Sequence, residues 1–112
     1  MSRYHTDWQD ICALSELNPG EGVCALVRDQ HLALFLLRSG QLFALDNHDP
    51  LGKANSVFRA QVDEESRTLA LEAAGQRRRY CLHSGRNLEQ QEVSLATFPV
   101  RVKNNRVQLA LG

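Results

Sequence analysis

Hydrophobic and polar residues alternate in short runs along this chain, and no long stretch follows a helical period. The most apolar run is 32–37, where Leu32, Leu34 and Leu36 would share one face of a strand and the intervening residues the other. A strand that is apolar on both faces is covered on both, so 32–37 is predicted to be a central strand. A short buried helix is the alternative, but turn signals on both sides favour the strand, since helices usually need about ten residues or more.

Turn residues divide the remaining chain into further strands. Asp29-Gln30 is predicted to close a hairpin between 22–28 and the central strand, and Ser39-Gly40 to precede a returning strand at 41–46. Asn104-Asn105 is predicted to form a type I′ hairpin, because asparagine tolerates positive φ. The other expected strands lie at 7–12, 69–72, 78–82, 98–103 and 107–111.

Two polar stretches are predicted to lie outside these strands. Residues 59–68 are interpreted as a solvated turn, and 87–94 could hold a single helical turn. Short strands joined by hairpins, with no long helix, indicate an all-β antiparallel sandwich or barrel.

Two stretches of the chain, 43–51 and 73–85, carry a more specific pattern. The first is a strand that enters a polar turn and stops at Pro50, which has no backbone N–H. The second is a loop, then a strand containing Arg79-Tyr80, then a turn at Gly85. Together they resemble the two cluster-binding loops of a Rieske [2Fe–2S] domain. In that family the first loop carries Cys-x-His and the second carries Cys-x-x-His. The two cysteines bind one iron and the two histidines bind the other.

The ligand residues of that family are missing here. When the two loops are aligned with the family's, the cysteine and histidine of the first fall on Asp49 and Leu51. Those of the second fall on Ala73 and Gln76. Leu51 and Ala73 have no donor atom at all. The resemblance therefore implies the fold of a Rieske domain without its cluster.

The order and spacing of motifs over nearly the whole chain are similar to those of one family, the small subunits of assimilatory NADH-dependent nitrite reductases. These motifs lie at 8–12, 22–26, 43–47, 49–50, 100–103 and 107–109. The resemblance implies a single Rieske-like domain over residues 1–112. A smaller, degenerate cluster-binding subdomain would span roughly 47–86.

The resemblance also implies a function in nitrate assimilation. The large subunit of such an NAD(P)H-dependent enzyme would carry FAD, sirohaem and a [4Fe–4S] cluster and would reduce nitrite to ammonium. This chain would be its cofactor-free, non-catalytic small subunit, docking on the large subunit or stabilising it, with no catalytic residue of its own. Two alternatives are a Rieske-type ferredoxin, which would need Cys and His at the four ligand positions, and a stand-alone binding module on the same scaffold.

Charge and composition exclude some partners. The chain has 112 residues with 13 basic and 13 acidic side chains, so no net field draws it to nucleic acid or anionic lipid. Its longest apolar run is far too short to cross a bilayer, and its first residues lack the apolar core of a signal peptide. A cytoplasmic location is expected. In a reducing compartment the three cysteines, Cys12, Cys24 and Cys81, are expected to be free thiols.

The densest charge run, 77–79, supplies the candidate partner contacts. Arg79 matches the family's arginine–aromatic strand and is expected to be structural. Arg77 and Arg78, with His48 of the first loop, are candidates for a partner interface because the two loops should lie at an exposed tip. The alternatives are a solvated loop for the arginines and a turn-capping role for His48 beside Asp49.

No metal or catalytic site is predicted. Cys81 and His83 are two apart in a strand and could share a face, but a zinc site would need about two more ligands, and only His48 is a candidate. The chain has no glycine-rich phosphate loop, no HExxH and no nucleophile elbow.

Overall fold

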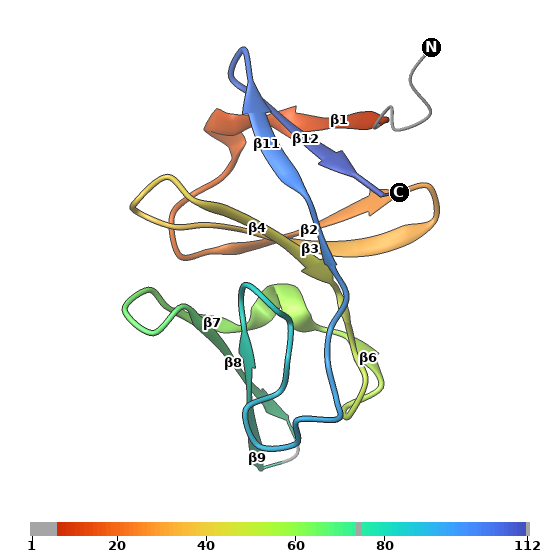
Figure 1. The fold of residues 1–112 in the computed structure, drawn as a ribbon, viewed down its shortest axis with the longest axis vertical. Coiled ribbons are helices and arrows are strands. Elements are labelled where there is room, and N and C mark those ends of the chain that lie inside the picture. Colours follow the sequence, from red (N-terminus) through yellow and green to blue (C-terminus); the bar gives the residue numbers. More distant parts are fainter. Residues whose placement is uncertain (1–6, 74, 112) are drawn as a thin grey trace.

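Figure 1 shows the fold in a computed structural model that describes residues 7–73 and 75–111. The predicted all-β antiparallel architecture is confirmed. The strands are β1 Trp8–Ala13, β2 Gly22–Val27, β3 Gln30–Leu36, β4 Leu42–Asp46, β5 His48–Asp49, β6 Ala54–Asn55, β7 Gln61–Asp63, β8 Thr68–Ala73, β9 Gln76–Cys81, β10 Thr97–Phe98, β11 Val100–Lys103 and β12 Arg106–Ala110.

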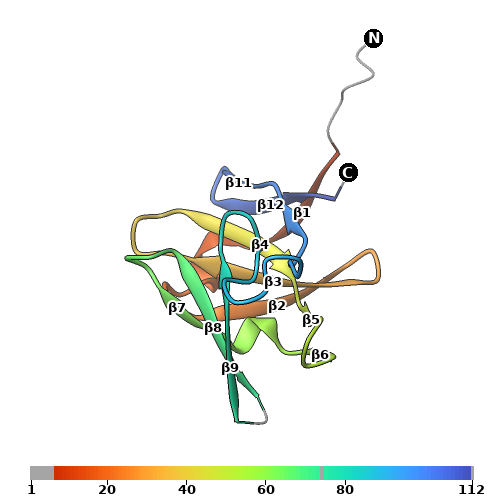
Figure 2. The same ribbon diagram turned by 60° about the horizontal axis from the view of Figure 1, so that its bottom comes forward.

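The strands form three stacked layers and one short ladder. The central layer is the sheet β10-β4-β3-β2, with the sheet β1-β12-β11 on one side and the sheet β7-β8-β9 on the other (Figures 1 and 2). The two-stranded ladder β5-β6 joins the central layer to the third. We call the first two layers the body, and β5–β9 the loop end.

Strand β3 explains why the layers stack on both faces of the central sheet. Leu32 and Leu34 pack in a core beneath β12 with Leu109, whereas Ala33 and Phe35 pack in a second core against β8 and β9. All four β3 side chains are fully buried. The prediction of a central strand covered on both faces is confirmed, because its alternating residues belong to two different cores.

The first predicted hairpin is shifted by one residue. Val27 pairs with Gln30, so the two-residue turn is Arg28-Asp29, both with positive φ, and not Asp29-Gln30. Moving a two-residue turn by one position shifts the pairing of the two strands by two residues. The same faces therefore stay buried, and the hydrophobic pattern could not distinguish the two registers. The type I′ turn at Asn104-Asn105 is confirmed by positive φ at both residues.

The predicted strand 98–103 is in fact two strands in two sheets. β10 pairs with β4 in the central sheet, and β11 pairs with β12 in the outer one. Pro99 lies between them, at the point where the chain changes sheets. Proline cannot donate to a ladder, so this is a position where a continuous strand would break.

Two other polar stretches also differ from expectation. Residues 61–63, interpreted as part of a solvated turn, form β7, which pairs with β8. The stretch 87–94 is a loop and not a helical turn. Within the described ranges, helix is confined to two three-residue 3-10 turns, Leu14–Glu16 and Val57–Arg59. None there is long and apolar enough to cross a membrane.

Candidate functional site

Asp49, at one of the expected cluster-ligand positions, is the centre of a buried polar network. Its side chain is only 1% exposed. Oδ1 accepts hydrogen bonds from the Leu51 N–H and the Tyr80 hydroxyl, both at 3.1 Å, and Oδ2 accepts one from Arg78 Nη2 at 2.6 Å. Burial alone would raise the pKa of the Asp49 carboxyl, but the hydrogen bonds outweigh it and hold that pKa below its ordinary value.

Strand β9 supplies the other two members of this network by simple alternation. Arg78 and Tyr80 point inward, whereas Arg77 and Arg79 are exposed. Tyr80 is fully buried, and that burial raises the pKa of its phenol. The Asp49–Arg78 ion pair and the Tyr80 hydrogen bond therefore tie β5 to β9, which lie 29 to 31 residues apart in sequence.

The prediction that Arg78 lies on an exposed partner surface is wrong. Its residue exposure is 7%, and its guanidinium pairs with Asp49 inside the fold. The reason is that the expected second loop is a tight hairpin. Ala73 pairs with Gln76, so β9 begins at Gln76 and its register carries the side chain of Arg78 inward.

The residues at the four ligand positions do not fit a [2Fe–2S] cluster. Leu51 has no donor, the Asp49 oxygens are already engaged, and Ala73 pairs with Gln76 in the backbone ladder of the hairpin. Gly52 leaves just enough room for the ion pair: a Cβ there would lie 2.5 Å from Asp49 Oδ2 and 2.7 Å from Arg78 Nη2. Next to Gly52, the space between the two segments is therefore occupied by the Asp49–Arg78 pair.

The other candidate contact residues lie on the surface. His48 is exposed, and its Nδ1 lies 3.3 Å from Asn55 Oδ1, so it does not pair with the buried Asp49. Arg77 is exposed and only loosely paired, with Nη1 3.7 Å from Glu72 Oε1. Arg79 donates two hydrogen bonds to the Glu89 carboxylate, from its side-chain Nε at 2.8 Å and from its backbone N–H at 3.1 Å. These contacts are in keeping with its expected structural role.

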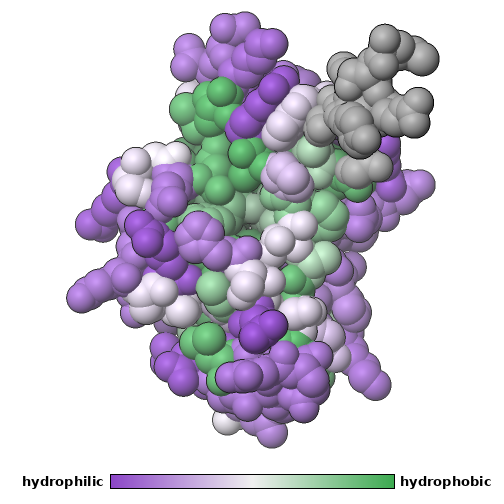
Figure 3. Space-filling view, in the orientation of Figure 1, coloured by the Kyte–Doolittle hydropathy of each residue, from purple (hydrophilic) through white to green (hydrophobic). Residues whose placement is uncertain are grey.

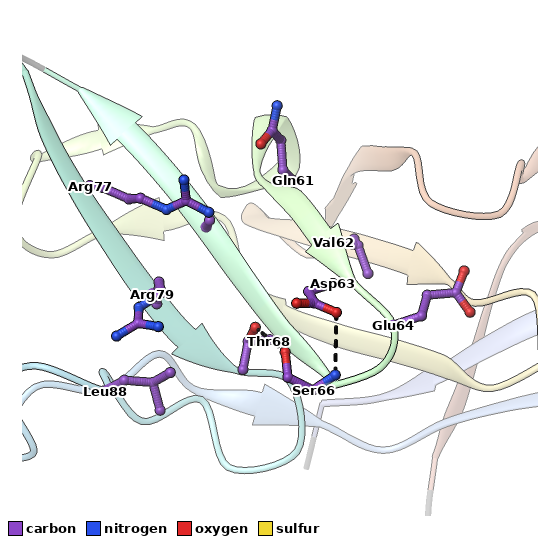
Figure 4. Close-up of a pocket in the computed structure, with 10 residues that line it drawn as sticks. Gln61, Val62, Asp63, Glu64, Ser66, Thr68, Arg77, Arg79 and Leu88 are labelled. Atoms are coloured by element: carbon purple, nitrogen blue, oxygen red, sulfur yellow. Dashed lines mark hydrogen bonds between the residues drawn. The ribbon is translucent and has the colours of Figure 1, made fainter.

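Two hollows flank β9. Figure 4 shows the first, about 570 Å³, where Arg77 and Arg79 project from β9 on the outer face of the β7-β8-β9 sheet near Thr68 and Leu88. The second, about 480 Å³, lies beside the ion pair. We call it the β9 pocket, and its lining residues are Leu51, Gln76, Arg77, Arg78, Asn87, Glu89 and Gln90.

The β9 pocket brings together two of the ligand positions, Leu51 and Gln76, with one residue that the sequence reasoning missed. Asn87 is 1% exposed, and its Oδ1 accepts hydrogen bonds from the N–H groups of Glu89 and Gln90. Asparagine followed by a polar turn indicates such a capping bond, but nothing local indicates that the residue is buried beside β9.

Cys81 and His83, the candidate metal ligands, differ in exposure: Cys81 is partly buried. His83 is exposed and packs edge-on against Phe43, with the ring centroids 5.0 Å apart. Burial would raise the pKa of the Cys81 thiol, but hydrogen bonds from the hydroxyl and N–H of Ser84 and from the His83 N–H lower it. Over residues 7–73 and 75–111, no three His, Cys, Asp or Glu side chains are grouped to hold a metal ion.

Comparison with known proteins assigns the chain to a family. Residues 7–110 match the family described as Rieske-like [2Fe–2S] domain. The nitrite reductase (NADH) small subunit of Salmonella typhimurium is 33% identical over 105 residues, covering 93% of this chain and 97% of that protein. The solved structure of the Escherichia coli protein NirD is 32% identical, with a TM-score of 0.82, and the match covers 96% of this chain and 99% of that one.

Two further matches are informative in different ways. The nitrite reductase [NAD(P)H] large subunit of Klebsiella oxytoca contains a region 29% identical over 100 residues, which covers 89% of this chain but 10% of that protein. The ferredoxin of a carbazole 1,9a-dioxygenase from Nocardioides aromaticivorans has a TM-score of 0.81 at 14% identity, over 94% of this chain and 98% of that one. The second likeness concerns the fold alone.

Proposed function

From the premise that this chain belongs to the Rieske-like [2Fe–2S] domain family, and within it to the nitrite reductase (NADH) small subunits, we propose that it is a cluster-free accessory subunit of such an enzyme. It docks on the large subunit and stabilises it, in the cytoplasm and in nitrate assimilation. The large subunit carries FAD, sirohaem and the [4Fe–4S] cluster, and this chain contributes no catalytic residue.

One observation carries the proposal of docking. In the Klebsiella oxytoca large subunit a region similar to this chain is part of the large polypeptide itself. A covalent connection holds two modules at a high effective concentration. Where the module is a separate chain, a binding surface must keep it on the large subunit in place of the covalent connection. We therefore expect this chain to carry a surface that recognises the large subunit.

The arrangement of the fold supports a docking surface at the loop end. Trp8 of β1 pairs with Ala110 of β12, so the two ends of the described chain lie together on the body. They lie at the opposite end of the molecule from the β8–β9 turn (Figure 1). A longer polypeptide can enter and leave the module there without disturbing β5–β9. The exposed Arg77 and His48 remain candidate contacts at the loop end.

The chemistry of the ligand positions supports an accessory role over electron transfer. A Rieske centre needs two thiolates and two imidazoles, and the positions here hold a carboxylate, an amide and two aliphatic side chains. The carboxylate of Asp49 is committed to Arg78, and neither group changes oxidation state at physiological potentials. No observation favours the ferredoxin alternative beyond the shared fold.

Co-purification tests the proposal directly. The full chain is tagged and co-expressed with the large subunit of the same organism, and the purified material is analysed by size-exclusion chromatography. We expect the two chains to elute together. We also expect the small chain, purified alone after growth with ample iron, to lack iron and acid-labile sulfide. Separate elution would contradict docking, and a rhombic two-iron EPR signal after reduction would contradict the cluster-free assignment.

A further inference from the structure

Strand β2 (Gly22–Val27) has an unpaired backbone edge, which we call the β2 edge. β2 is the last strand of the central sheet, and it pairs with β3 in unbroken register over all six residues. In the part of the chain that the structure describes, no other backbone hydrogen bond joins β2 to a neighbour. A two-residue hairpin turn such as Arg28-Asp29 is closed by a hydrogen-bonded pair, and bonded and non-bonded pairs alternate from there. The N–H and C=O groups of Cys24 and Leu26 therefore point away from β3.

The other edges of the three larger sheets carry protections that β2 lacks. β10 and β7 have only two and three residues, β1 contains a β-bulge, and the outer edge of β9 is bonded to the loop that follows it. β11 carries two cations, Arg101 and Lys103. Short strands, bulges, charges and covering loops are the devices by which natural proteins keep sheet edges from pairing. β2 has six residues with no charge, proline or bulge, so it is suited to receive another strand.

The side chains of β2 also favour an added strand. Leu26 is 63% exposed, more than any other large apolar side chain that the structure describes, and Cys24 is exposed as well. On the other face of the strand, Val23, Ala25 and Val27 line a hollow of about 470 Å³ between β1 and β2. An added strand would therefore cover an exposed apolar side chain and have room for its own side chains.

The charges at the two ends of β2 select the occupant. Glu21 lies directly before the strand and Arg28 directly after it, with no charge between them. Both are exposed: Arg28 is loosely paired with Asp7, 3.7 Å away, and Glu21 accepts a 3.3 Å hydrogen bond from Asn18. A second β2 strand in the antiparallel direction brings the acid of each copy to the base of the other, whereas parallel pairing would bring like charges together. The β2 edge is thus complementary to itself.

We propose that two copies of this chain pair through their β2 edges as an antiparallel, two-fold symmetric dimer. In the register centred on Ala25, the outward backbone groups of Cys24 in each copy bond to those of Leu26 in the other. The two central sheets then form one continuous sheet, and each Leu26 lies beside the other copy's Cys24. This contact lies on the body and does not rest on the proposed function, since it needs no large subunit.

Sedimentation of the full chain in reducing buffer tests self-association. We expect the weight-average mass to rise with protein concentration from 12.6 kDa toward twice that value. Hydrogen exchange followed by NMR locates the contact, because exchange of the Cys24 and Leu26 amides should slow as the concentration rises. The Val102 amide, which faces outward from β11 by the same alternation, should exchange equally at every concentration.

A matched pair of variants distinguishes this contact from other surfaces. Leu26→Lys places a positive charge from each copy at the centre of the contact and should weaken self-association at least about 10-fold. Val102→Lys makes a similar change at a 43% exposed side chain on the β11 edge and should leave self-association unchanged.

An exchange of the end charges tests the direction of pairing. Glu21→Arg and Arg28→Glu should each weaken self-association several-fold, because each brings like charges together. The double variant should recover most of the loss, since each arginine again meets a glutamate of the other copy. The two positions are roughly 20 Å apart along one strand, so this recovery cannot arise within a single chain. A double variant as weak as the singles would contradict antiparallel pairing.

A mass of 12.6 kDa at every concentration would overturn the proposal. So would a dimer that Leu26→Lys leaves intact, because a different surface would then hold it. If the Cys24 and Leu26 amides are protected only when the large subunit is added, the occupant of the β2 edge is a strand of that subunit, and the second copy is excluded. Failure of the chain to bind the large subunit would contradict the proposed function but would leave the test of the dimer unaffected.

Discussion

The body and the loop end of this molecule share an apolar core, and the loop end adds a buried ion pair to it. In the body, aliphatic and aromatic side chains cover both faces of β3. The face of the molecule seen in Figure 3 carries more apolar surface over the body than over the largely hydrophilic loop end. At the loop end, β5 is joined to β9 by the Asp49–Arg78 ion pair. An apolar core weakens gradually as groups are removed, whereas a buried ion pair fails as a unit, since losing one partner leaves the other charged and buried.

The largest expected effect is at the ion pair. Asp49→Ala should lower the free energy of unfolding by about 3–5 kcal/mol, because Arg78 keeps a buried charge without its counter-ion. Chemical denaturation measures the loss. Asp10→Ala is the matched control: Asp10 and Arg106 are also 2.6 Å apart but are exposed, so that loss should be much smaller. Equal losses at the two sites would show that burial does not distinguish them.

A double substitution sharpens this prediction. Asp49→Leu combined with Arg78→Leu removes both charges together and should cost less than either single change, since no charge is left unpaired. If the double variant is as unstable as the sum of the two singles, the ion pair does not act as a unit.

Next in size is the central strand of the body. Leu34→Ala should cost about 2–5 kcal/mol, as expected for a fully buried leucine. Leu26→Ala, on the neighbouring strand but 63% exposed, should change stability by less than about 0.5 kcal/mol. Similar losses for the two leucines would contradict the placement of β3 between two cores.

A smaller effect is expected from crowding the ion pair. Gly52→Ala places a methyl group against Asp49 Oδ2 and Arg78 Nη2 and should cost about 1–3 kcal/mol. The same substitution in an Asp49→Ala background should cost less, because one of the crowded groups is gone. Identical costs in the two backgrounds would mean that Gly52 matters for another reason.

Acid should remove the contribution of Asp49 selectively. The folded-state pKa of Asp49 lies below its unfolded value, so the unfolded chain binds more protons between the two pKa values. The stabilisation is fully present above the unfolded pKa of about 3.9 and is lost as the pH falls through the folded pKa. We expect the stability gap between wild type and Asp49→Asn to be constant near neutral pH and to narrow below about pH 4. A gap that is unchanged at pH 3 would contradict this assignment.

The smallest effect on stability is expected at Arg77. Because its side chain is exposed, Arg77→Glu should change the free energy of unfolding by less than about 0.5 kcal/mol while weakening association with the large subunit. Arg86→Glu, exposed on the loop after β9, serves as the charge-matched control in the same binding measurement. Unchanged association for Arg77→Glu would place the docking surface elsewhere. Arg78→Glu is unsuitable for this test because it would break the buried pair.

Much of the body could be predicted from local pattern, and less of the loop end. The alternation in 32–37 predicted a strand covered on both faces, and Asn104-Asn105 predicted a tight turn, because each depends only on neighbouring residues. β7 was missed because its three residues contain one apolar side chain, Val62, and the strand is defined by backbone bonds to β8. The switch of sheets at Pro99 was missed because Phe98 and Val100 keep the same alternation on both sides of it.

The sequence by itself determined that no cysteine or histidine stands at the four aligned ligand positions. Two of them, Leu51 and Ala73, have no donor atom in any fold. Only the tertiary structure decided what the residues at those positions contact. Arg77 and Arg78 are the same residue type side by side, and the register of β9 alone exposes one and buries the other. The same packing of segments about 30 residues apart pairs Arg78 with Asp49. Local sequence records which residues are polar, but which polar groups meet depends on which strands come into contact.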